Sequence, residues 1–371
     1  MIRLAMIVKN ESEVIERGLR AVLPFVDTWC IVDTGSTDDT KEKIIAITSA
    51  LGKPGVLYDR EWVNFAHNRS EALRLGRTQA PASDYLLMID ADDIFQGPKT
   101  GGKISIPTGL DAVNVKCVMN LNSVFYRIHC FSAKRNWVYK GVVHEYADMA
   151  DADGKPLRVG SFDDIGCWID VRTEGSRSKN PRKYEDDAVI LDAELVKTPD
   201  DSRYQFYAAQ SWRDAGNKPK ALVRYLKRVE MKEGYGEERY VALLNAIRLT
   251  DSFEDAVKYT WHSIEINAKR REAAFALFRR ARERPPKEWT QELYALGSFV
   301  DAAASSVVLP SFLFAEDSTY TWAFSDEFCI ISFFTGHKEA AIRLAVQALM
   351  AAPESQRARI QKNLEQSLKM K

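Results

Sequence analysis

The sequence predicts an α/β domain followed by an all-α region, and three observations support this prediction. Short apolar runs alternate with amphipathic helical stretches from Ile2 to Asp90, polar residues directly follow the apolar runs, and the chain after Tyr184 has a helical pattern to its end. Such alternation of strands and helices produces a parallel sheet with helices on both faces. A length of 371 residues also favours two or three domains over a single core.

The first part of the chain is expected to form strands separated by helices. Apolar residues recur at the spacing of one helix face from Val14 to Val22, and Ser36 or Thr37 would cap the second helix through its side-chain oxygen. In order, the predicted elements are the strand Ile2–Val8, the helix Glu11–Leu23, the strand Trp29–Val32, the helix Thr37–Leu51, the strand Val56–Tyr58, the helix Phe65–Arg77 and the strand Tyr85–Ile89.

The pattern changes after Asp111, where strand-like runs follow one another without long helices between them. These runs, which predict a mixed sheet that completes the first domain, are Val113–Met119, Ser123–Ser132 and Trp137–Val143. The polar and basic stretch Arg172–Lys183 then has the composition of a mobile loop or linker. We therefore expect an N-terminal domain over 1–170, a basic linker over 171–184 and a helical domain over 185–371.

The helical part carries a weak internal repeat. Residues at the offsets of a tetratricopeptide helix pair are Ala209, Trp212, Gly216, Ala221 and Tyr225. Ala256 follows Ala221 by 35 residues, which is near the expected period, and a third copy is Gly336, Ala341, Ala348 and Pro353. The pattern therefore favours an array of helix pairs, with an irregular helical bundle as the alternative.

Composition and charge limit the classes of partner. Lys plus Arg and Asp plus Glu both number 52, so no overall charge drives binding to nucleic acid or to a membrane. The five cysteines are scattered and odd in number, which argues against a disulfide framework or a zinc cluster and favours reduced, buried thiols. We find no secretory signal pattern and no apolar stretch long enough to span a membrane, and we expect a cytoplasmic protein.

Two polar motifs follow the first two predicted strands, at the sheet edge where ligands of parallel sheets bind. Val8-Lys9-Asn10-Glu11 exposes backbone N–H groups and polar side chains, although Asn10 could simply cap the next helix. In Asp33-Thr34-Gly35-Ser36-Thr37-Asp38, Asp33 could accept an N–H group from a base edge, and Gly35 allows a tight turn. The alternative is a capping turn, and one turn can serve both purposes.

The run Asp90-Ala91-Asp92-Asp93 follows the fourth predicted strand. Carboxylates so close together repel one another unless cations or hydrogen-bond donors offset their charge. A turn at a strand end can aim Asp90 and Asp92 at one ion, and Mg²⁺ or Mn²⁺ would suit such oxygen ligands and also bind a diphosphate. The alternative is an acidic loop tip or a helix cap.

Two further candidates come from His144-Glu145 and from Arg69. Glu145 could act as a general base and His144 as a ligand or a base, unless the two form an ordinary surface or core-edge pair. Arg69, in the first turns of the helix Phe65–Arg77, could hold a phosphate with two hydrogen bonds. A salt bridge on the helix surface is the alternative for Arg69.

Together these motifs resemble the enzymes of glycosyltransferase family 2, which have the GT-A fold. The resemblance is carried, in order, by AMIVKNE, VDTGSTDDT, FAHNRSEAL, LLMIDADD and GVVHEY, of which the first four lie within residues 5–93. Two later segments resemble a subgroup of this family that has a tetratricopeptide-like C-terminal region, and they are RKYEDDAVILDAEL and RYQFYAAQSWRDAGN. Sublancin-type peptide S-glycosyltransferases, lipopolysaccharide-core transferases and phage-encoded transferases belong to that broader group.

The resemblance implies a Rossmann-like mixed GT-A sheet, an all-α tetratricopeptide-like domain and specific site roles. Asp33 and Glu11 would contact the nucleoside, Asp90 would lie near the ribose, Asp92 would bind the metal and Arg69 would lie near the diphosphate. The candidate donor-binding residues are Val8, Asn10, Glu11, Asp33, Ser36, Arg69, Asp90 and Ala91, the candidate metal ligands are Asp90, Asp92 and His144, and the candidate catalytic residues are Glu145 and Asp93.

We thus expect an inverting glycosyltransferase that uses Mn²⁺ or Mg²⁺ and a nucleotide-sugar, with UDP preferred through the family. The metal and Arg69 would offset the charge of the leaving diphosphate, and a carboxylate would deprotonate the acceptor. The QxxRW motif of processive relatives is absent, which argues against polymer synthesis. The basic stretch with Arg172, Arg177 and Arg182 could close over the diphosphate.

The acceptor is the least defined partner, and a peptide or protein, a glycan and a hydroxymethylated DNA base are all open. An anionic acceptor could bind a basic segment of the helical part, although a solvated helix face is the alternative for this segment. The basic residues of this segment are Lys269, Arg270, Arg271, Arg279, Arg280, Arg282, Arg284 and Lys287. The chain could also form a homo-oligomer. Two other classes are a sugar-1-phosphate nucleotidylyltransferase, which needs a glycine-rich loop after the first strand, and a non-catalytic helical-repeat protein.

Overall fold

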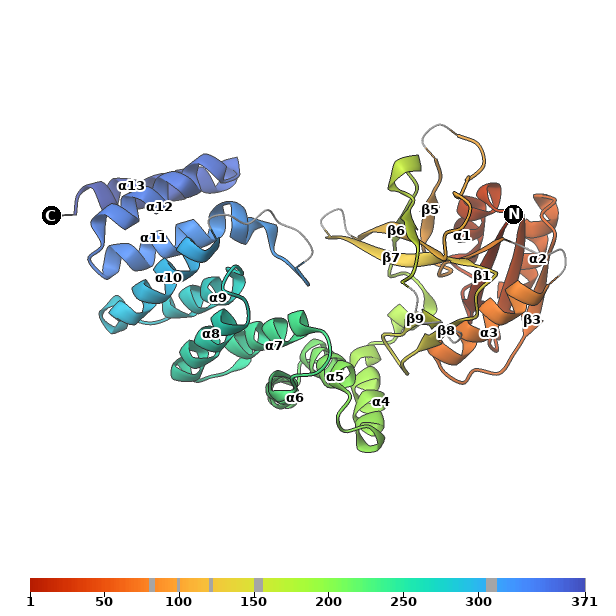
Figure 1. Cartoon of the computed structure of the whole chain (residues 1–371), viewed down its shortest axis with the longest axis horizontal. Coiled ribbons are helices and arrows are strands. Elements are labelled where there is room, and N and C mark those ends of the chain that lie inside the picture. The colour runs from red at the N-terminus through yellow and green to blue at the C-terminus, as the bar shows by residue number, and fades with distance from the viewer. Residues whose placement is uncertain (80–83, 99–100, 120–122, 150–155, 305–311, 371) are drawn as a thin grey trace. The chain divides into compact units, whose positions relative to one another are not determined.

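The structure is a computed structural model that describes residues 1–79, 84–98, 101–119, 123–149, 156–304 and 312–370. The chain divides into two compact units, Met1–Lys183 and Tyr184–Lys371, and each is described by itself below (Figure 1).

A mixed sheet of nine described strands forms the centre of the N-terminal unit. Along its main path the strands are β3 (Gly55–Asp59), β2 (Thr28–Asp33), β1 (Ile2–Val8), β4 (Tyr85–Met88), β7 (Ser123–Ser132), β6 (Ala112–Met119), β11 (Trp168–Val171) and β5 (Ile94–Gln96), and β10 (Val159–Ser161) pairs with β6. The first four are parallel, whereas β7 runs antiparallel to both of its neighbours. The hairpin of β8 (Trp137–Lys140) and β9 (Tyr146–Met149) is separate.

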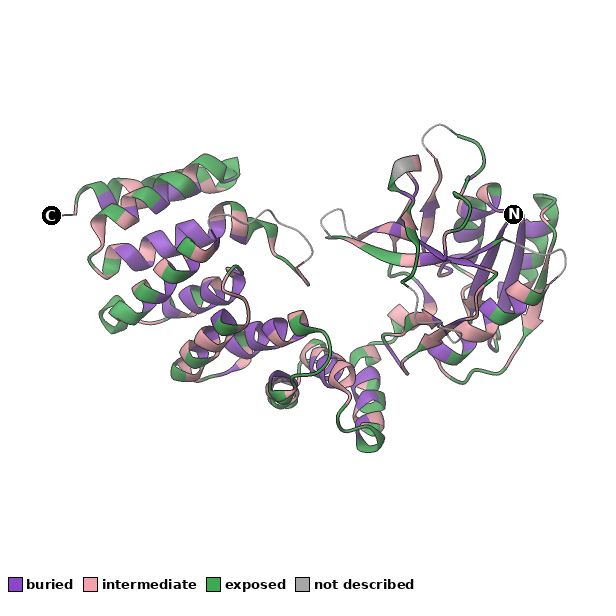
Figure 2. Ribbon diagram, in the orientation of Figure 1, coloured by how far each residue is buried: buried purple, intermediate pink, exposed green. Residues whose placement is uncertain are grey.

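Helices cover both faces of the parallel part of this sheet. Along β1, Leu4 and Met6 join a core with residues of α1 (Ile15–Val22) and α2 (Thr40–Ala50), whereas Ala5 joins the opposite core with residues of α3 (Phe65–Thr78). Successive residues of a strand point to opposite faces, so a strand that is covered on both sides must be apolar throughout. The buried strands in Figure 2 agree with this requirement. The predicted α/β architecture is confirmed.

Several predicted boundaries and caps are wrong. The helix expected from Glu11 starts at Ile15, after a turn in which the N–H groups of Val14 and Ile15 both donate to the carbonyl of Glu11, and the 3₁₀ turn Leu23–Phe25 follows it. The next helix starts at Thr40 rather than Thr37, and its N-cap is Asp39 without a side-chain capping bond. The strands β5, β10 and β11 were not predicted, because runs of three or four residues show too little alternation.

The C-terminal unit is built from antiparallel helices that pack mostly on their neighbours in sequence. Its helices are α4 (Lys183–Lys197), α5 (Ser202–Asp214), α6 (Lys218–Glu230), α7 (Gly236–Leu249), α8 (Phe253–Asn267), α9 (Glu272–Ala281), α10 (Gln291–Ala304), α11 (Phe324–Phe334), α12 (Lys338–Ala351) and α13 (Glu354–Leu368). Gly216 and Gly336 adopt positive φ at the turns of two pairs, α5–α6 and α11–α12, as the repeat pattern predicts. The helical array is confirmed, whereas its assignment to the tetratricopeptide family stays a prediction.

The residues of the proposed repeat contribute to the core of the C-terminal unit. Ala209, Trp212, Ala221 and Tyr225 pack together between α5 and α6, and Ala256 is buried in the adjacent core. All five cysteines are buried and form no disulfide, as expected. Among the described residues, no helix combines the length and the apolar character that crossing a membrane requires.

Candidate active site

The predicted motifs meet at one edge of the sheet. Val8 pairs with Asp33 at the ends of β1 and β2, and Ala5 of β1 pairs with Met88 at the end of β4. Because these strands are parallel, the residues that follow them emerge on the same side. The motifs that begin at Val8, Asp33 and Asp90 therefore lie together, as their positions after strands predict.

Hydrogen bonds join the first two motifs into one scaffold. The Asn10 N–H donates to Ser36 Oγ over 2.9 Å, and Asn10 Oδ1 accepts the Thr37 N–H over 2.7 Å. The Glu11 N–H donates to Thr40 Oγ1 over 2.8 Å. Asn10 has φ 55°, a left-handed conformation that Asn tolerates better than most residues. Ser36 therefore fixes the other loop instead of capping a helix, which corrects the prediction for its side chain.

Asp33 combines a structural role with an unused acceptor. Its Oδ1 accepts the N–H groups of Gly35 and Ser36 over 2.9 and 2.8 Å, and Gly35 makes this turn with φ 102°. Its Oδ2 is buried and, within the described part of the chain, has no hydrogen-bond partner. A buried acceptor without a partner costs about 1–3 kcal/mol, so a ligand that donates to this oxygen would gain by doing so.

Arg69 lies between two of the candidate carboxylates. Its Nη2 donates to Asp90 Oδ1 over 2.6 Å and its Nε donates to Glu145 Oε1 over 2.8 Å, while its guanidinium lies 5.7 Å from the centre of the Tyr139 ring. Desolvation raises the pKa of Asp90, but the charge and hydrogen bond of Arg69 outweigh it and hold that pKa below its usual value. The sequence did not indicate Tyr139, whose ring covers this ion pair.

The other carboxylates of the site are short of positive charge. Burial raises the pKa of Glu11 to about 7. The Ser176 N–H group opposes this rise, and the charges of Asp92 and Asp90 add to it. Burial and the charge of Asp90 raise the pKa of Asp93 to about 8, and burial also raises that of Asp92. Asp93 is buried and accepts the Arg172 N–H over 3.0 Å. Neighbouring carboxylates thus repel one another at this edge.

The three predicted metal ligands do not form a closed cage. Asp90 pairs with Arg69, Asp92 accepts two backbone N–H groups, and His144 is exposed with φ 54°. No group of three or more His, Cys, Asp or Glu that could hold a metal occurs among the residues that the structure describes.

The basic stretch expected as a mobile linker instead folds onto the acidic residues. Backbone N–H groups of Glu174 and Gly175 donate to Asp92 Oδ2 over 3.1 and 2.9 Å, and that of Ser176 donates to Glu11 over 3.1 Å to Oε2. The segment contains a 3₁₀ turn, Ser176–Lys179. Sequence reasoning missed these contacts because a backbone N–H group has no residue-specific signature.

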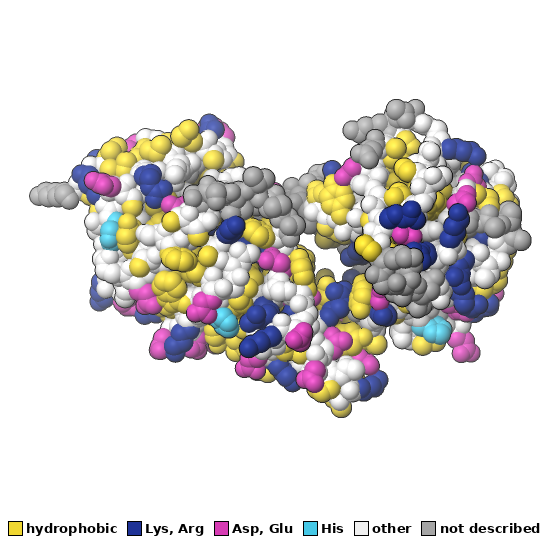
Figure 3. Space-filling model, viewed as in Figure 1, with side chains coloured by type: hydrophobic (Ala, Val, Ile, Leu, Met, Phe, Trp, Pro, Cys, Tyr) yellow, Lys and Arg dark blue, Asp and Glu magenta, His cyan; other side chains and the backbone are white. Residues whose placement is uncertain are grey.

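The basic segment of the C-terminal unit is not a free cationic surface. Most of its arginines are bound within the unit: Arg270 to Glu237 and Glu272, Arg271 to Asp301, Arg282 to Glu327, Arg284 to Glu288, and Arg280 to the carbonyls of Ile247 and Thr250. Figure 3 shows acidic and basic side chains interspersed on the face it presents. Of the acidic partners only Glu272 lies within residues 269–287, so the composition of this segment alone does not reveal the pairing.

A comparison with known protein families matches part of the N-terminal unit. Residues 4–99 match the family described as Glycosyl transferase family 2. None of the curated proteins matches the chain.

Three solved structures show limited similarity. TarS 1-349 of S. aureus in complex with UDP-GlcNAc is 12% identical over 85% of this chain and 95% of its own, with a TM-score of 0.28. Glucosyl-3-phosphoglycerate synthase of M. tuberculosis is 26% identical over 25% of this chain and 34% of its own, at 0.19. The thermophilic TPR protein TTC0263 of Thermus thermophilus is 17% identical over 49% of this chain and 91% of its own, at 0.30. Such low TM-scores establish neither the fold nor the function of this chain.

The family match over residues 4–99 gives the class of enzyme, which is a glycosyltransferase. The matched segment is a family 2 domain, and it contains Val8, Asp33, Arg69 and the run from Asp90 to Asp93, which lie at the described edge of the sheet.

Proposed function

We propose that the N-terminal unit transfers a sugar from a UDP-sugar to an acceptor, with inversion at the sugar carbon and with Mn²⁺ or Mg²⁺. The observation that carries this proposal is the buried, unpartnered Oδ2 of Asp33 at the edge where the acidic motifs meet. That oxygen suits the N–H donor of a nucleobase, and the acidic run beside it suits a cation that binds a diphosphate.

The proposed donor-binding roles follow from where each residue lies at this edge of the sheet. Asp33 and Glu11 would hold the nucleoside, and Asp90, kept ionised beside Arg69, would accept from the ribose hydroxyls. Val8, Asn10 and Ser36 support these side chains through the joined loops, and Ala91 lies in the turn that follows β4. Arg69 retains further N–H donors for the diphosphate, because the hydrogen bonds described here use only its Nε and Nη2.

Asp92 is the residue that we propose to bind the cation, together with oxygens of the donor diphosphate. A bound cation would neutralise the charge that develops on the leaving group. Asp90 and His144 are weaker candidates as ligands, since Asp90 is paired with Arg69 and His144 is exposed.

Glu145 is the proposed general base. Arg69 fixes one of its oxygens, and the side chain is 15% exposed. Glu145 would take the proton of the acceptor as the acceptor attacks the sugar carbon from the face opposite the diphosphate. As the new bond forms, the bond from this carbon to the diphosphate oxygen breaks, and its electron pair leaves with the diphosphate. Asp93 has a pKa near neutrality, but it is buried and bound to the Arg172 N–H, which makes it the second candidate.

The acceptor stays open among a peptide or protein, a glycan and a modified DNA base, and the internally paired basic segment gives no support to the DNA option. Cytoplasmic location and homo-oligomer formation also stay predictions. A nucleotidylyltransferase is disfavoured because the loop after β1, KNESE, contains no glycine.

A thermal-shift panel of UDP-, GDP- and CMP-sugars, with and without Mn²⁺, tests the proposal. We expect the UDP-sugar with Mn²⁺ to raise the melting temperature most. No shift with any of them would contradict a nucleotide-sugar enzyme and favour a non-catalytic helical-repeat protein.

A further inference from the structure

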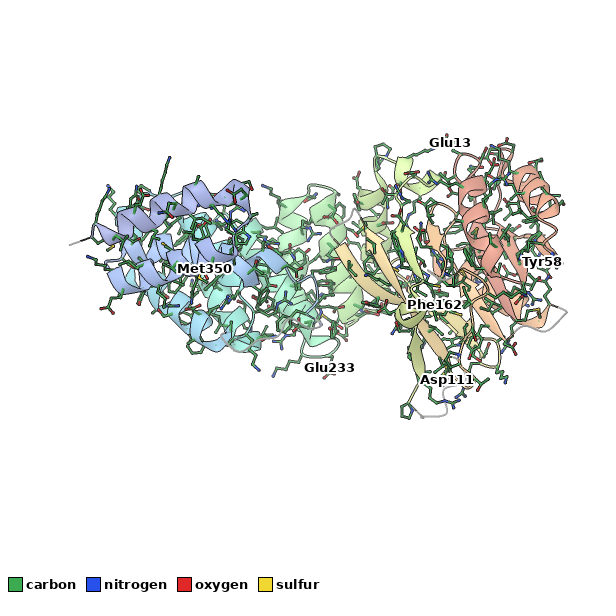
Figure 4. All side chains as sticks on the ribbon, turned by 90° about the horizontal axis from the view of Figure 1, so that it is seen from above. Glu13, Tyr58, Asp111, Phe162, Glu233 and Met350 are labelled. Atoms are coloured by element: carbon green, nitrogen blue, oxygen red, sulfur yellow. The ribbon has the colours of Figure 1, made fainter. Side chains whose placement is uncertain are left out.

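Residues 172–179, here called the strap, connect β11 to the start of the helical unit and cross the acidic edge of the sheet. At the sides of the strap, Glu174 pairs with Arg17 of α1 over 2.5 Å, Lys179 pairs with Glu13 over 2.7 Å, and the Arg177 guanidinium lies 4.3 Å from the centre of the Phe65 ring. Glu13 lies at the surface of the N-terminal unit (Figure 4). Both ion pairs are about half exposed or more, so each contributes little to the stability of this position.

The backbone of the strap lies directly against the two carboxylates that the proposed function needs. Asp92 Oδ2 accepts two of its N–H groups and Glu11 accepts a third. A Cβ atom added to Gly175 would lie 3.1 Å from Asp92 Oδ2 and 3.2 Å from Glu11 Oε2. A side chain at this position would therefore push both carboxylates away by a few tenths of an ångström.

A ligand of these carboxylates would compete with the strap for Asp92 Oδ2 and for both oxygens of Glu11. N–H dipoles offset the charge of a carboxylate only in part, whereas a divalent cation offsets it fully and is a better partner for Asp92. A nucleoside on Glu11 would likewise meet the strap backbone that now contacts this side chain.

We propose that the strap closes the donor site in the unliganded chain and must leave Asp92 and Glu11 before a nucleoside diphosphate and its cation bind. This inference rests on the proposed function, because it takes both carboxylates as donor-binding groups. The two exposed ion pairs oppose such a release only weakly, and the competition of the cation drives it.

Limited trypsin digestion of the full chain tests the proposal, because the strap contains Arg172, Arg177 and Lys179. We expect cleavage after Arg177 to become about tenfold faster with UDP and Mn²⁺ together, since the loss of hydrogen bonds to charged groups raises the population of the open segment. Slower cleavage with UDP and Mn²⁺ would mean that the strap closes over the donor, and would overturn the proposal.

A variant and a matched control separate the strap from the site. Gly175→Ala crowds both carboxylates and, because Gly175 has φ −64°, does so without backbone strain. We expect faster ligand-free cleavage after Arg177 and tighter calorimetric binding of UDP with Mn²⁺. Gly236→Ala, where the added methyl meets no atom within 4 Å, should change neither.

The possible failures are distinguishable. If UDP with Mn²⁺ binds neither the wild type nor Gly175→Ala, the proposed function fails. If it binds the wild type but Gly175→Ala changes neither cleavage nor affinity, the proposed function stands and the strap proposal is wrong.

Discussion

Replacing Arg69 with Met tests the ion pairs at the centre of the site. The substitution keeps an unbranched chain beside Tyr139 but leaves Asp90 and Glu145 facing each other without the guanidinium. Removing one partner of a buried ion pair costs about 3–5 kcal/mol. The Arg69 side chain is 11% exposed and that of Asp90 is 44% exposed, so water can solvate Asp90 and the lower end of this range, about 3 kcal/mol, applies.

Denaturant unfolding of the full chain, followed by a signal from the N-terminal unit, measures this loss. For a unit of this size the same loss lowers the melting temperature by about 6–12 °C. The double variant Arg69→Met with Glu145→Gln should recover part of the stability, because it removes one of the two stranded charges. A loss below about 0.5 kcal/mol in Arg69→Met, or no recovery in the double variant, would refute the reasoning.

Four further changes probe other parts of the site. Asp92→Ala should abolish sugar transfer while circular dichroism shows a folded protein; metal-dependent activity in this variant would rule out the assignment. Glu145→Gln should lower kcat by about 10²–10⁴-fold, with UDP affinity by calorimetry nearly unchanged, and an unchanged kcat would shift the role of base to Asp93. Burial lowers the pKa of His129 to about 4, so the unfolded state binds the extra proton between pH 4 and 6.5 and stability falls as the pH drops through this window. His129→Gln should remove up to about 3 kcal/mol of that fall, and an identical pH profile for variant and wild type would contradict the assignment. Burial and the charge of Asp90 raise the pKa of Asp93 to about 8, so the contribution of Asp93 to stability falls as the pH rises from about 4 towards 8. Asp93→Asn should therefore stabilise the protein more at pH 8 than at pH 5. A larger stabilisation at pH 5 than at pH 8 would refute this prediction.

The parallel half of the fold could be predicted because its signals are local. A strand that is covered on both faces, such as Ile2–Val8, must be apolar throughout, and the motifs after such strands necessarily share one sheet edge. The short strands β5, β10 and β11 could not be predicted, since tertiary pairing rather than their own sequence places them.

The meeting of the motifs at one sheet edge could be predicted from the sequence, whereas the contacts between their side chains could not. Nothing in the sequence indicates that Arg69 bridges Asp90 and Glu145, which are separated from it by 21 and 76 positions. The basic segment is a second example, because Glu237, Asp301 and Glu327, which pair with its arginines, come from other helices. Charge along the sequence therefore predicts surface charge poorly when a helical array brings distant helices together.

The most direct test of the central claim is a crystal structure of the chain with UDP and Mn²⁺. We predict that a base N–H group donates to Asp33 Oδ2 and that the anomalous signal places manganese between Asp92 and the diphosphate. Nucleotide and metal bound elsewhere, with Asp33 Oδ2 still unpartnered, would contradict it.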